Sequence, residues 1–423
     1  MSTLRHTRPF VLVRCFAITV GALLAVAGAL HAQPLDTLVV QAWANDPKLK
    51  AKDLEFRAAM QQVAQVSTLP DPRLSLGVFI TPVETRLGPQ RARVSLMQMF
   101  PWFGMLDAQG RAAEARAQAV YDGYLAERDA VAFKVRVAFH PLHELDRSLQ
   151  VEHRELDLLS RLEDLARERY ANGQVTQVDV LRARMATNAQ RTAVEVLEAQ
   201  RPSLVARLNA LRDRAADTPV TVLDSITVID VSAWPSPDSL ERAPDLIALQ
   251  DQARAANARA DATRAAGGPS FGLGLDYLWI DPRTDADPSG NGRDALMPML
   301  TLDLPIFRKR YTSARMEAEL DEQRFDQMHE AALRDRQAAY AEAWWQAQKG
   351  ALMVDLMDAQ IDLARSAADL LVEAYAQGQE RFEEVLRMED LLLRYRLTRL
   401  SALKEHRIAV AKLQYLTSID NNN

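Results

Sequence analysis

The sequence predicts a mainly α-helical protein with a β-barrel part, built from two structural repeats. Three observations support this fold class. The composition is typical of long helices, similar segments recur about 200 residues apart, and each repeat contains two short segments in which apolar and polar residues alternate.

Composition and charge exclude several classes of protein. Of the 423 residues, 26% are charged and 48% hydrophobic, but only 6% are aromatic and 16 are glycine. The net charge of −6 disfavours a nucleic-acid partner, and the apolar content disfavours intrinsic disorder. After residue 32 no apolar run approaches the roughly 18 residues of a membrane-spanning helix, which disfavours a helical inner-membrane protein.

Residues 1–32 are predicted to be a secretory signal peptide. Arg5, Arg8 and Arg14 form a positive segment, an apolar run follows over 16–30, and small residues lead to cleavage after Ala32. An uncleaved membrane anchor is the alternative. Cys15, the one cysteine in the sequence, lies in this segment, so the exported protein has no thiol for disulfides or thiolate metal sites.

The remainder is interpreted as a tandem repeat. We expect a first repeat over 33–216, a β-containing insert at mid-level over 217–238, and a second repeat over 239–423. Four short segments of the first repeat recur in the second in the same order: 45–49 and 242–246, 72–76 and 269–273, 100–103 and 304–307, and 170–174 and 375–379.

Each repeat contains a predicted β-hairpin, at 71–99 and at 270–304. In the first strand Leu74, Leu76, Val78 and Ile80 alternate with polar or small residues, and the other three strands alternate similarly. An apolar outer face with a polar inner face is typical of a membrane barrel, although a half-buried soluble sheet has the same period. The aromatic residues at the strand ends suit a membrane interface: Phe100, Trp102, Trp279 and Phe307.

Four strands cannot close a barrel, and an open sheet edge cannot face lipid. Several protomers must therefore share one barrel if the strands lie in a membrane. Three protomers would supply twelve strands, although edge pairing alone does not fix that number.

The helix lengths predict how each repeat is completed. Long helices are expected over 104–172 and 308–377, and helices of half that length over 179–214 and 383–417. Helices over 239–266 and 35–69 supply the missing halves, so each repeat has one full-length helix and one composite helix. Pro141 is expected to kink or break the first long helix, and His140 and His143 are interpreted as scattered polar residues rather than a metal site.

The distal helical turns are the most specific motif. Tyr170 and Tyr375 each begin a Tyr-x-x-Gly-Gln sequence between two helices. The glycine suits a helix C-terminus that needs positive φ, and Thr176 or Asp179 can cap the helix that follows. A tight helix–turn–helix is therefore expected at both tips, and a plain hairpin turn without a partner is the alternative.

These duplicated tips, with the paired hairpins and the Phe-Pro-Trp-Phe sequence at 100–103, resemble the TolC family of outer-membrane efflux proteins. The resemblance covers the whole mature chain and implies a TolC-like homotrimer, in which four membrane strands per protomer share a 12-stranded barrel above a long α-helical periplasmic tunnel. It also implies docking of the tips onto a periplasmic adaptor (membrane fusion) protein and an inner-membrane efflux pump. Residues 98–104 look most like the heavy-metal branch of the family, which is CzcC- and CusC-like.

The resemblance also assigns residues. The adaptor-contacting tips correspond to Gly173, Gln174, Val175, Gly378, Gln379 and Glu380. The family closes its tunnel with acidic residues after the second tip, where Glu384 matches and Arg387 does not, so a gate formed by this pair is expected.

The expected function is that of a passive conduit in the outer membrane, exporting heavy-metal cations, with no enzyme activity, cofactor or bound metal. A soluble periplasmic coiled-coil adaptor or scaffold is the main alternative, and an exported enzyme is disfavoured because no constellation of nucleophile and base is present.

Overall fold

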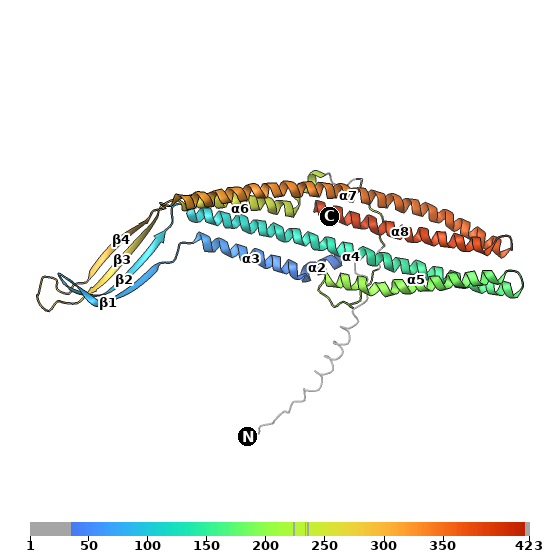
Figure 1. Cartoon of the computed structure of the whole chain (residues 1–423), viewed down its shortest axis with the longest axis horizontal. Helices are drawn as coiled ribbons and strands as arrows, with labels where there is room; N and C mark the ends of the chain where they lie inside the picture. Colours follow the sequence, from blue (N-terminus) through green and yellow to red (C-terminus); the bar gives the residue numbers. More distant parts are fainter. Residues whose placement is uncertain (1–34, 223–224, 233, 235–236, 419–423) are drawn as a thin grey trace, which may run out of the picture.

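The computed structural model describes residues 35–222, 225–232, 234 and 237–418, so the expected signal peptide lies outside the described residues. The molecule is elongated, with a small sheet at one end and long helices running away from it (Figure 1). The two helical turns farthest from the sheet form the opposite end of the molecule.

Each repeat pairs one long helix with two shorter ones placed end to end. In the first repeat α4 (Met105–Ala171) packs against α3 (Pro47–Ser67) near the sheet and α5 (Gln177–Ala210) near the tips. In the second, α7 (Arg308–Ala376) packs against α6 (Pro244–Ala266) and α8 (Phe382–Thr417) in the same way. The predicted full-length and half-length helices are present, but the expected pairing of the halves is wrong. We expected 239–266 to complete 179–214 and 35–69 to complete 383–417, whereas α3 and α5 lie along α4, and α6 and α8 lie along α7 (Figure 1). The helix α4 joins the repeats through contacts with α6 and α8.

The short helix that precedes the sheet in each repeat begins at an equivalent proline, Pro47 of α3 and Pro244 of α6, and a separate helical segment comes before it. We expected one helix over 35–69, but the structure has a separate α2 (Leu35–Asn45) before α3. Asp46 separates them because its side chain accepts a hydrogen bond from the Leu49 N–H at 2.9 Å, and Pro47 suits the first helical turn. In the second repeat a 3₁₀ helix, η1 (Pro237–Arg242), likewise precedes Pro244. Pro141, by contrast, lies within an unbroken α4.

The sheet has four antiparallel strands in the order β1 (Arg73–Thr85), β2 (Gly88–Phe100), β3 (Ser270–Ile280) and β4 (Ala295–Asp303). The register places apolar residues of all four strands side by side on one face, as in the row Leu76, Val94, Tyr277 and Leu296. These side chains are exposed, whereas Asp276 on the other face is fully buried beneath Arg93 and Ser95. The predicted two-faced sheet is confirmed, and β1 and β4 are its open edges.

The mid-level segment corrects one expectation. We expected β-structure within 217–238, but the described residues of that stretch contain no strand. Its alternating apolar residues pack on the helices instead: Val220 and Val222 join the cluster around Phe139, and Val231 joins that around Leu413. The alternation therefore reflects one face lying on a helical wall, and the described residues offer this segment no neighbouring strand to pair with.

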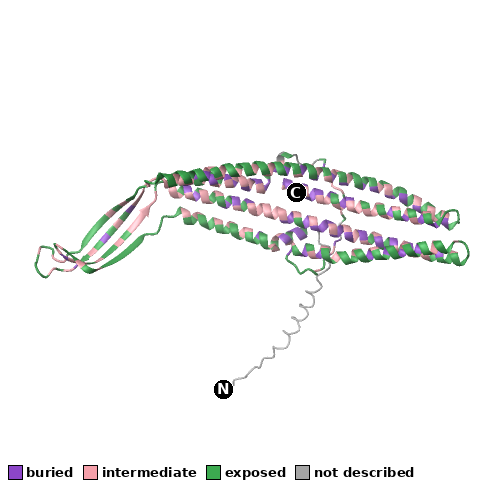
Figure 2. Ribbon diagram, viewed as in Figure 1, coloured by how far each residue is buried: buried purple, intermediate pink, exposed green. Residues whose placement is uncertain are grey.

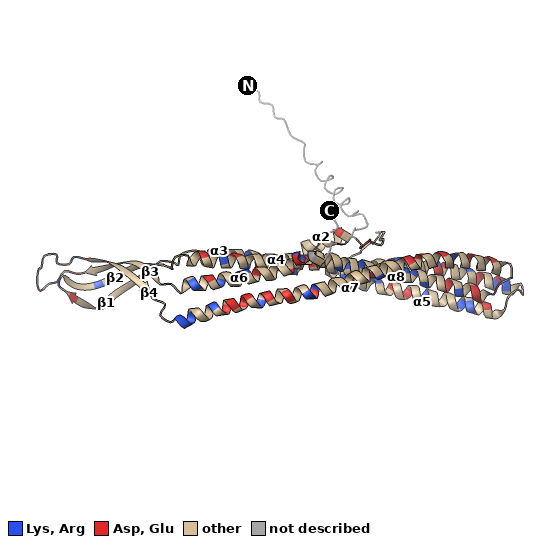
Figure 3. Ribbon diagram, turned by 90° about the horizontal axis from the view of Figure 1, so that it is seen from above, with Lys and Arg blue, Asp and Glu red and all other residues tan. Residues whose placement is uncertain are grey.

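The buried residues are concentrated at mid-level and beneath the tips, while much of the wall near the sheet is exposed (Figure 2). Charged residues run along all the long helices, but the sheet carries few (Figure 3). Among the described residues no helix is both long enough and apolar enough to cross a membrane.

Candidate docking and gating site at the helical tips

The two tips adopt the same backbone turn. In the first, Gly173 has φ of 70°, its N–H donates to the Tyr170 carbonyl at 2.9 Å, and the Gln174 N–H donates to the Arg169 carbonyl at 2.9 Å. This pair of bonds is the Schellman motif, which ends a helix by satisfying its last carbonyls. The positive φ explains the glycine, since a side chain there would be strained.

In the second tip Gly378 has φ of 74°, its N–H donates to the Tyr375 carbonyl at 3.0 Å, and the Gln379 N–H donates to the Ala374 carbonyl at 2.9 Å. The expected tight helix–turn–helix is therefore present twice. Of the six residues assigned to adaptor contact, five are exposed at these turns and Val175 is half-buried beneath them.

The helices that follow the turns begin differently. In the first tip the Asp179 carboxylate accepts from the Thr176 N–H at 3.1 Å and from its hydroxyl at 2.9 Å, as expected of a cap. In the second tip Arg381 occupies the cap position and offers no such group. The Glu384 carboxylate instead pairs with Arg387 one turn further along α8. The two proposed gate residues are thus in contact, with Arg387 largely exposed.

Contacts between the tips were not anticipated from the sequence. Arg169, in the last turn of α4, donates to the Tyr375 carbonyl at 2.7 Å and to the Ala376 carbonyl at the end of α7. Arg182 of α5 pairs with Glu383 of α8 at 3.0 Å. A basic residue in the last turn of a helix is a visible sequence signal, but its partner 206 residues away is not.

An apolar cluster supports these contacts from below. Tyr375 and Phe382 lie with ring centroids 5.3 Å apart, and the Arg169 guanidinium lies over the Tyr375 ring at 4.7 Å. Residues of α4, α5 and α8 complete the cluster: Leu159, Leu162, Ala166, Ala183 and Val385. The two tips of one chain are therefore packed as a unit.

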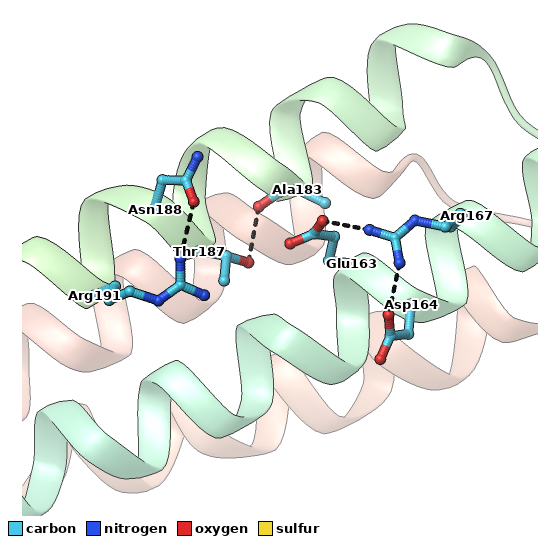
Figure 4. Close-up of polar contacts among 7 residues, drawn as sticks. All are labelled: Glu163, Asp164, Arg167, Ala183, Thr187, Asn188 and Arg191. Carbon is cyan, nitrogen blue, oxygen red and sulfur yellow. Dashed lines mark hydrogen bonds and ion pairs between the residues drawn. The ribbon is translucent and has the colours of Figure 1, made fainter.

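Most other ion pairs near the tips stay within one helix. Arg167, for example, pairs with Glu163 at 2.7 Å and with Asp164 at 3.1 Å, all on α4 (Figure 4). Such exposed pairs contribute little to stability, so the contacts of Arg169 and Arg182 are the ones that connect the tips.

A group of buried carboxylates lies farther up the same wall. Glu155 of α4 is only 2% exposed, and one of its carboxylate oxygens has no hydrogen-bond partner. Burial, and then the neighbouring carboxylate of Glu389, raise the pKa of Glu155 to about 7. Glu152 is paired differently, since its carboxylate accepts from the Gln190 amide.

His140 and His143, which were interpreted as scattered polar residues of the helix rather than a metal site, are both buried. Burial, and then the charge of Arg407, lower the pKa of His140 to about 3, so its imidazole is neutral at physiological pH. The described residues contain no group of three or more His, Cys, Asp or Glu side chains placed to hold a metal ion.

Comparison with known proteins identifies the repeated unit. A sequence model of the outer membrane efflux protein family matches residues 38–214 and, a second time, residues 236–418. The chain belongs to this family. No curated protein sequence matches it significantly. The family assigns a component of an outer-membrane efflux channel in a Gram-negative bacterium, a conduit rather than an enzyme, and rejects the soluble scaffold.

Solved structures share the fold at low sequence identity. CusC has a TM-score of 0.75 and 18% identity, covering 92% of both chains. A membrane protein from Pseudomonas aeruginosa has a TM-score of 0.74 and 21% sequence identity, and the match covers 90% of this chain and 93% of that one. The outer membrane protein VceC from Vibrio cholerae has a TM-score of 0.71 and 18% identity, and the match covers 90% of this chain and 95% of VceC. The expected TolC-like fold is confirmed.

Proposed function

We propose that the protein is the passive outer-membrane conduit of a tripartite efflux system, and that its helical tips dock onto a periplasmic adaptor joined to an inner-membrane pump. The observation that carries this proposal is the pair of identical exposed turns, centred on Gly173 and Gly378, at the end of the wall opposite the sheet. A channel whose sheet is anchored in the outer membrane presents this end to the periplasm.

We further propose a homotrimer, with twelve strands in one barrel. Two features of the single chain support it. The strands β1 and β4 leave open edges that lipid cannot satisfy. Tyr170 is 46% exposed, while Tyr375, its counterpart in the second repeat, is 2% exposed against the first tip. A neighbouring copy placed on the open side would cover Tyr170 as the first tip covers Tyr375.

A set of exposed apolar side chains on α7 also suits burial against a second copy, because it recurs at helical spacing along one face: Leu352, Leu356, Leu363 and Leu370.

Site-specific cross-linking tests the docking. Removal of the predicted leader would leave no cysteine, so Gln174→Cys and Gln379→Cys would each introduce a unique thiol. We expect both variants to cross-link in cells to a periplasmic adaptor identified by mass spectrometry. Glu195→Cys, exposed on the side of α5, is the matched control and should not. Equal cross-linking at all three positions, or none at the tips, would contradict the proposal.

The pair Glu384 and Arg387 is proposed as the tunnel aperture. In a trimer three copies of each would surround one axis, and such rings of charge select ions by sign. We expect the reconstituted trimer to conduct ions and expect Glu384→Ala or Arg387→Ala to raise its conductance, since each removes one side chain of the contact. If neither change alters single-channel conductance, the aperture lies elsewhere.

The cargo we propose is heavy-metal cations. Its support is the stretch at 98–104, which resembles the heavy-metal branch of the family. Deletion of the gene should then sensitise cells to heavy-metal salts more than to organic drugs, and the reverse pattern would reject this cargo.

A further inference from the structure

The face of the sheet turned away from the apolar one carries an unusual set of side chains. All four methionines of the strands lie on it, Met97 and Met99 from β2 and Met297 and Met299 from β4. Along the strands the apolar face carries mainly Leu, Val, Ile and aromatic residues, together with Ala92, Gln98 and Pro298, and no methionine. In a barrel whose apolar face meets lipid, the methionine face lines the channel.

The strand between these methionines, β3, has glycine at the positions next to them, so it places no side chain there. Across the sheet Met97 pairs with Gly274, which pairs with Met299, so no side chain separates the two methionines. A Cβ added to Gly272 would lie 2.5 Å from the sulfur of Met99 and 3.1 Å from that of Met97. One added to Gly274 would lie 3.1 Å from the Met97 sulfur. The thioethers of Met97 and Met99 thus converge over the glycine strand.

Arg73 of β1 lies opposite Met97 on this face and brings a positive charge to the edge of the patch, whereas the other polar neighbours are already paired. The Met97 sulfur accepts from the Thr301 hydroxyl at 3.8 Å, and the Met299 sulfur lies 3.9 Å from the Arg93 guanidinium. The charge of Arg93 is balanced by Asp276, which also accepts from Ser95. A hard cation that needs several oxygen ligands therefore finds no free carboxylate here, whereas neutral thioether sulfur remains.

We propose that Met97, Met99 and Met299 form a binding site for a soft monovalent cation, Cu(I) or Ag(I), on the lumen side of the barrel. Thioether sulfur is a soft donor that selects Cu(I) over hard cations. Neutral ligands add no charge to the lumen and bind less tightly than thiolates, which suits a site that a passing ion must leave. The proposal rests on the proposed conduit only in taking this face as the channel lining.

The alternative is that the methionines only fill the space above the glycines, as flexible apolar side chains often do. Substitution by leucine separates the two roles, because leucine keeps nearly the same volume and removes the sulfur.

The test is a calorimetric titration of the purified trimer with Ag(I) in chloride-free buffer. We expect the wild type to bind Ag(I), and expect Met97→Leu and Met299→Leu each to weaken binding about tenfold or more. Met185→Leu, which removes an exposed thioether of α5, is the matched control and should bind like the wild type. Ag(I) should also slow the peroxide oxidation of Met97 to its sulfoxide, measured by peptide mass spectrometry.

Equal binding by the wild type and the Met97→Leu and Met299→Leu variants, without protection of Met97, would overturn the site. Conductance in potassium nitrate distinguishes this failure from that of the conduit. If the wild type and the variants conduct ions equally well but the wild type binds no Ag(I), the metal site is rejected and the proposed channel is not affected. Absence of any conductance would reject the channel lining on which the site rests.

Discussion

At the scale of single residues, the tips show how one side chain links two repeats. At the end of α7 Arg169 supplies charge-assisted hydrogen bonds to two carbonyls, those of Tyr375 and Ala376, and the Tyr375 carbonyl also accepts from the Gly378 N–H. The same side chain covers the buried ring of Tyr375. Removing it would uncover that ring and remove both of these hydrogen bonds between the repeats, so the tip contact depends strongly on this one residue.

Arg169→Ala is expected to loosen the tips and raise the conductance of the reconstituted trimer. A hydrogen bond to a charged group contributes about 1.5–3 kcal/mol, which would raise the open population about tenfold or more. Arg167→Ala is the control, because Arg167 pairs only with residues of its own helix in the contacts drawn in Figure 4. Identical single-channel records for both variants and the wild type would show that Arg169 does not hold the tips closed.

Glu155 predicts a dependence of stability on pH. Its pKa is raised by burial and by Glu389, and further by Glu152 and Asp390, while Arg396 lowers it. Between pH 4.5, the ordinary pKa of a glutamate, and about pH 7, the folded protein holds the Glu155 proton more tightly than the unfolded chain does. Stability from this group is therefore greatest below pH 4.5 and is lost as the pH rises through 7.

Glu155→Gln should consequently raise the Tm of the trimer at pH 8 and change it little at pH 4.5, because an amide avoids ionisation in the buried site. The raised pKa sets the scale of the gain, since a difference of one between the folded and unfolded pKa values corresponds to about 1.4 kcal/mol between the two protonation states. Glu195→Gln, at an exposed position of α5, serves as the control. A gain in Tm that is independent of pH would contradict ionisation as the cause.

At the scale of elements, the wall depends on close approach between neighbouring helices. Gly350 of α7 lies against α8 so closely that an added Cβ would come within 2.7 Å of the His406 Cβ and 2.9 Å of its Cα. His406 is itself fixed, since its Nε2 accepts from the Ile229 N–H at 2.9 Å and its Nδ1 lies 2.8 Å from the Ala347 carbonyl oxygen. This glycine therefore joins α7, α8 and the mid-level segment.

Gly350→Ala is predicted to destabilise the protein by about 1–3 kcal/mol through overpacking. Gly123→Ala, in the interior of α4, is the matched control, because among the described residues no atom outside the adjacent helical backbone lies within 4 Å of the added Cβ. Since alanine is the better helix former, this control should be neutral or stabilising by up to about 1 kcal/mol. Thermal unfolding followed by circular dichroism would show a lower Tm for the first variant only, and equal effects would refute the close contact.

At the scale of the whole molecule, the sheet and the helical wall face different surroundings. The sheet exposes a continuous apolar face and carries few charges, whereas the helices carry charge along their length (Figure 3). Phe100 and Phe271, with ring centroids 5.5 Å apart, mark the boundary between the two parts. This division is that of a channel anchored by its strands, with its helices in water.

Two neighbouring residues of β1 test this division. Leu76→Lys places a charge on the apolar face, which costs about 2–4 kcal/mol near the bilayer midplane. Ser75→Lys places the same charge on the opposite face, beside Ser95, and should be tolerated. We expect the first variant alone to reduce the amount of heat-modifiable trimer in outer-membrane fractions. Equal losses for both would show that β1 is not a lipid-facing strand.

The sequence alone determined the features that depend on local pattern. The two faces of the sheet follow from period-two alternation, and the tip turns follow from a glycine with positive φ. The repeat of these signals predicted the full-length and half-length helices, but not the break before Pro47 or which two halves lie along the same long helix. Signals of this kind act within a few residues, so they can be recognised without knowing what lies alongside.

The tertiary structure decided which distant surfaces meet. It placed Arg169 on the end of α7, buried His140 and Glu155 within the wall, and laid the mid-level segment on helices rather than in a sheet. It also brought Met97 and Met299 to either side of Gly274. None of these follows from a local period, because each depends on the register between elements far apart in the chain. That register is set by burial and close packing over the whole wall.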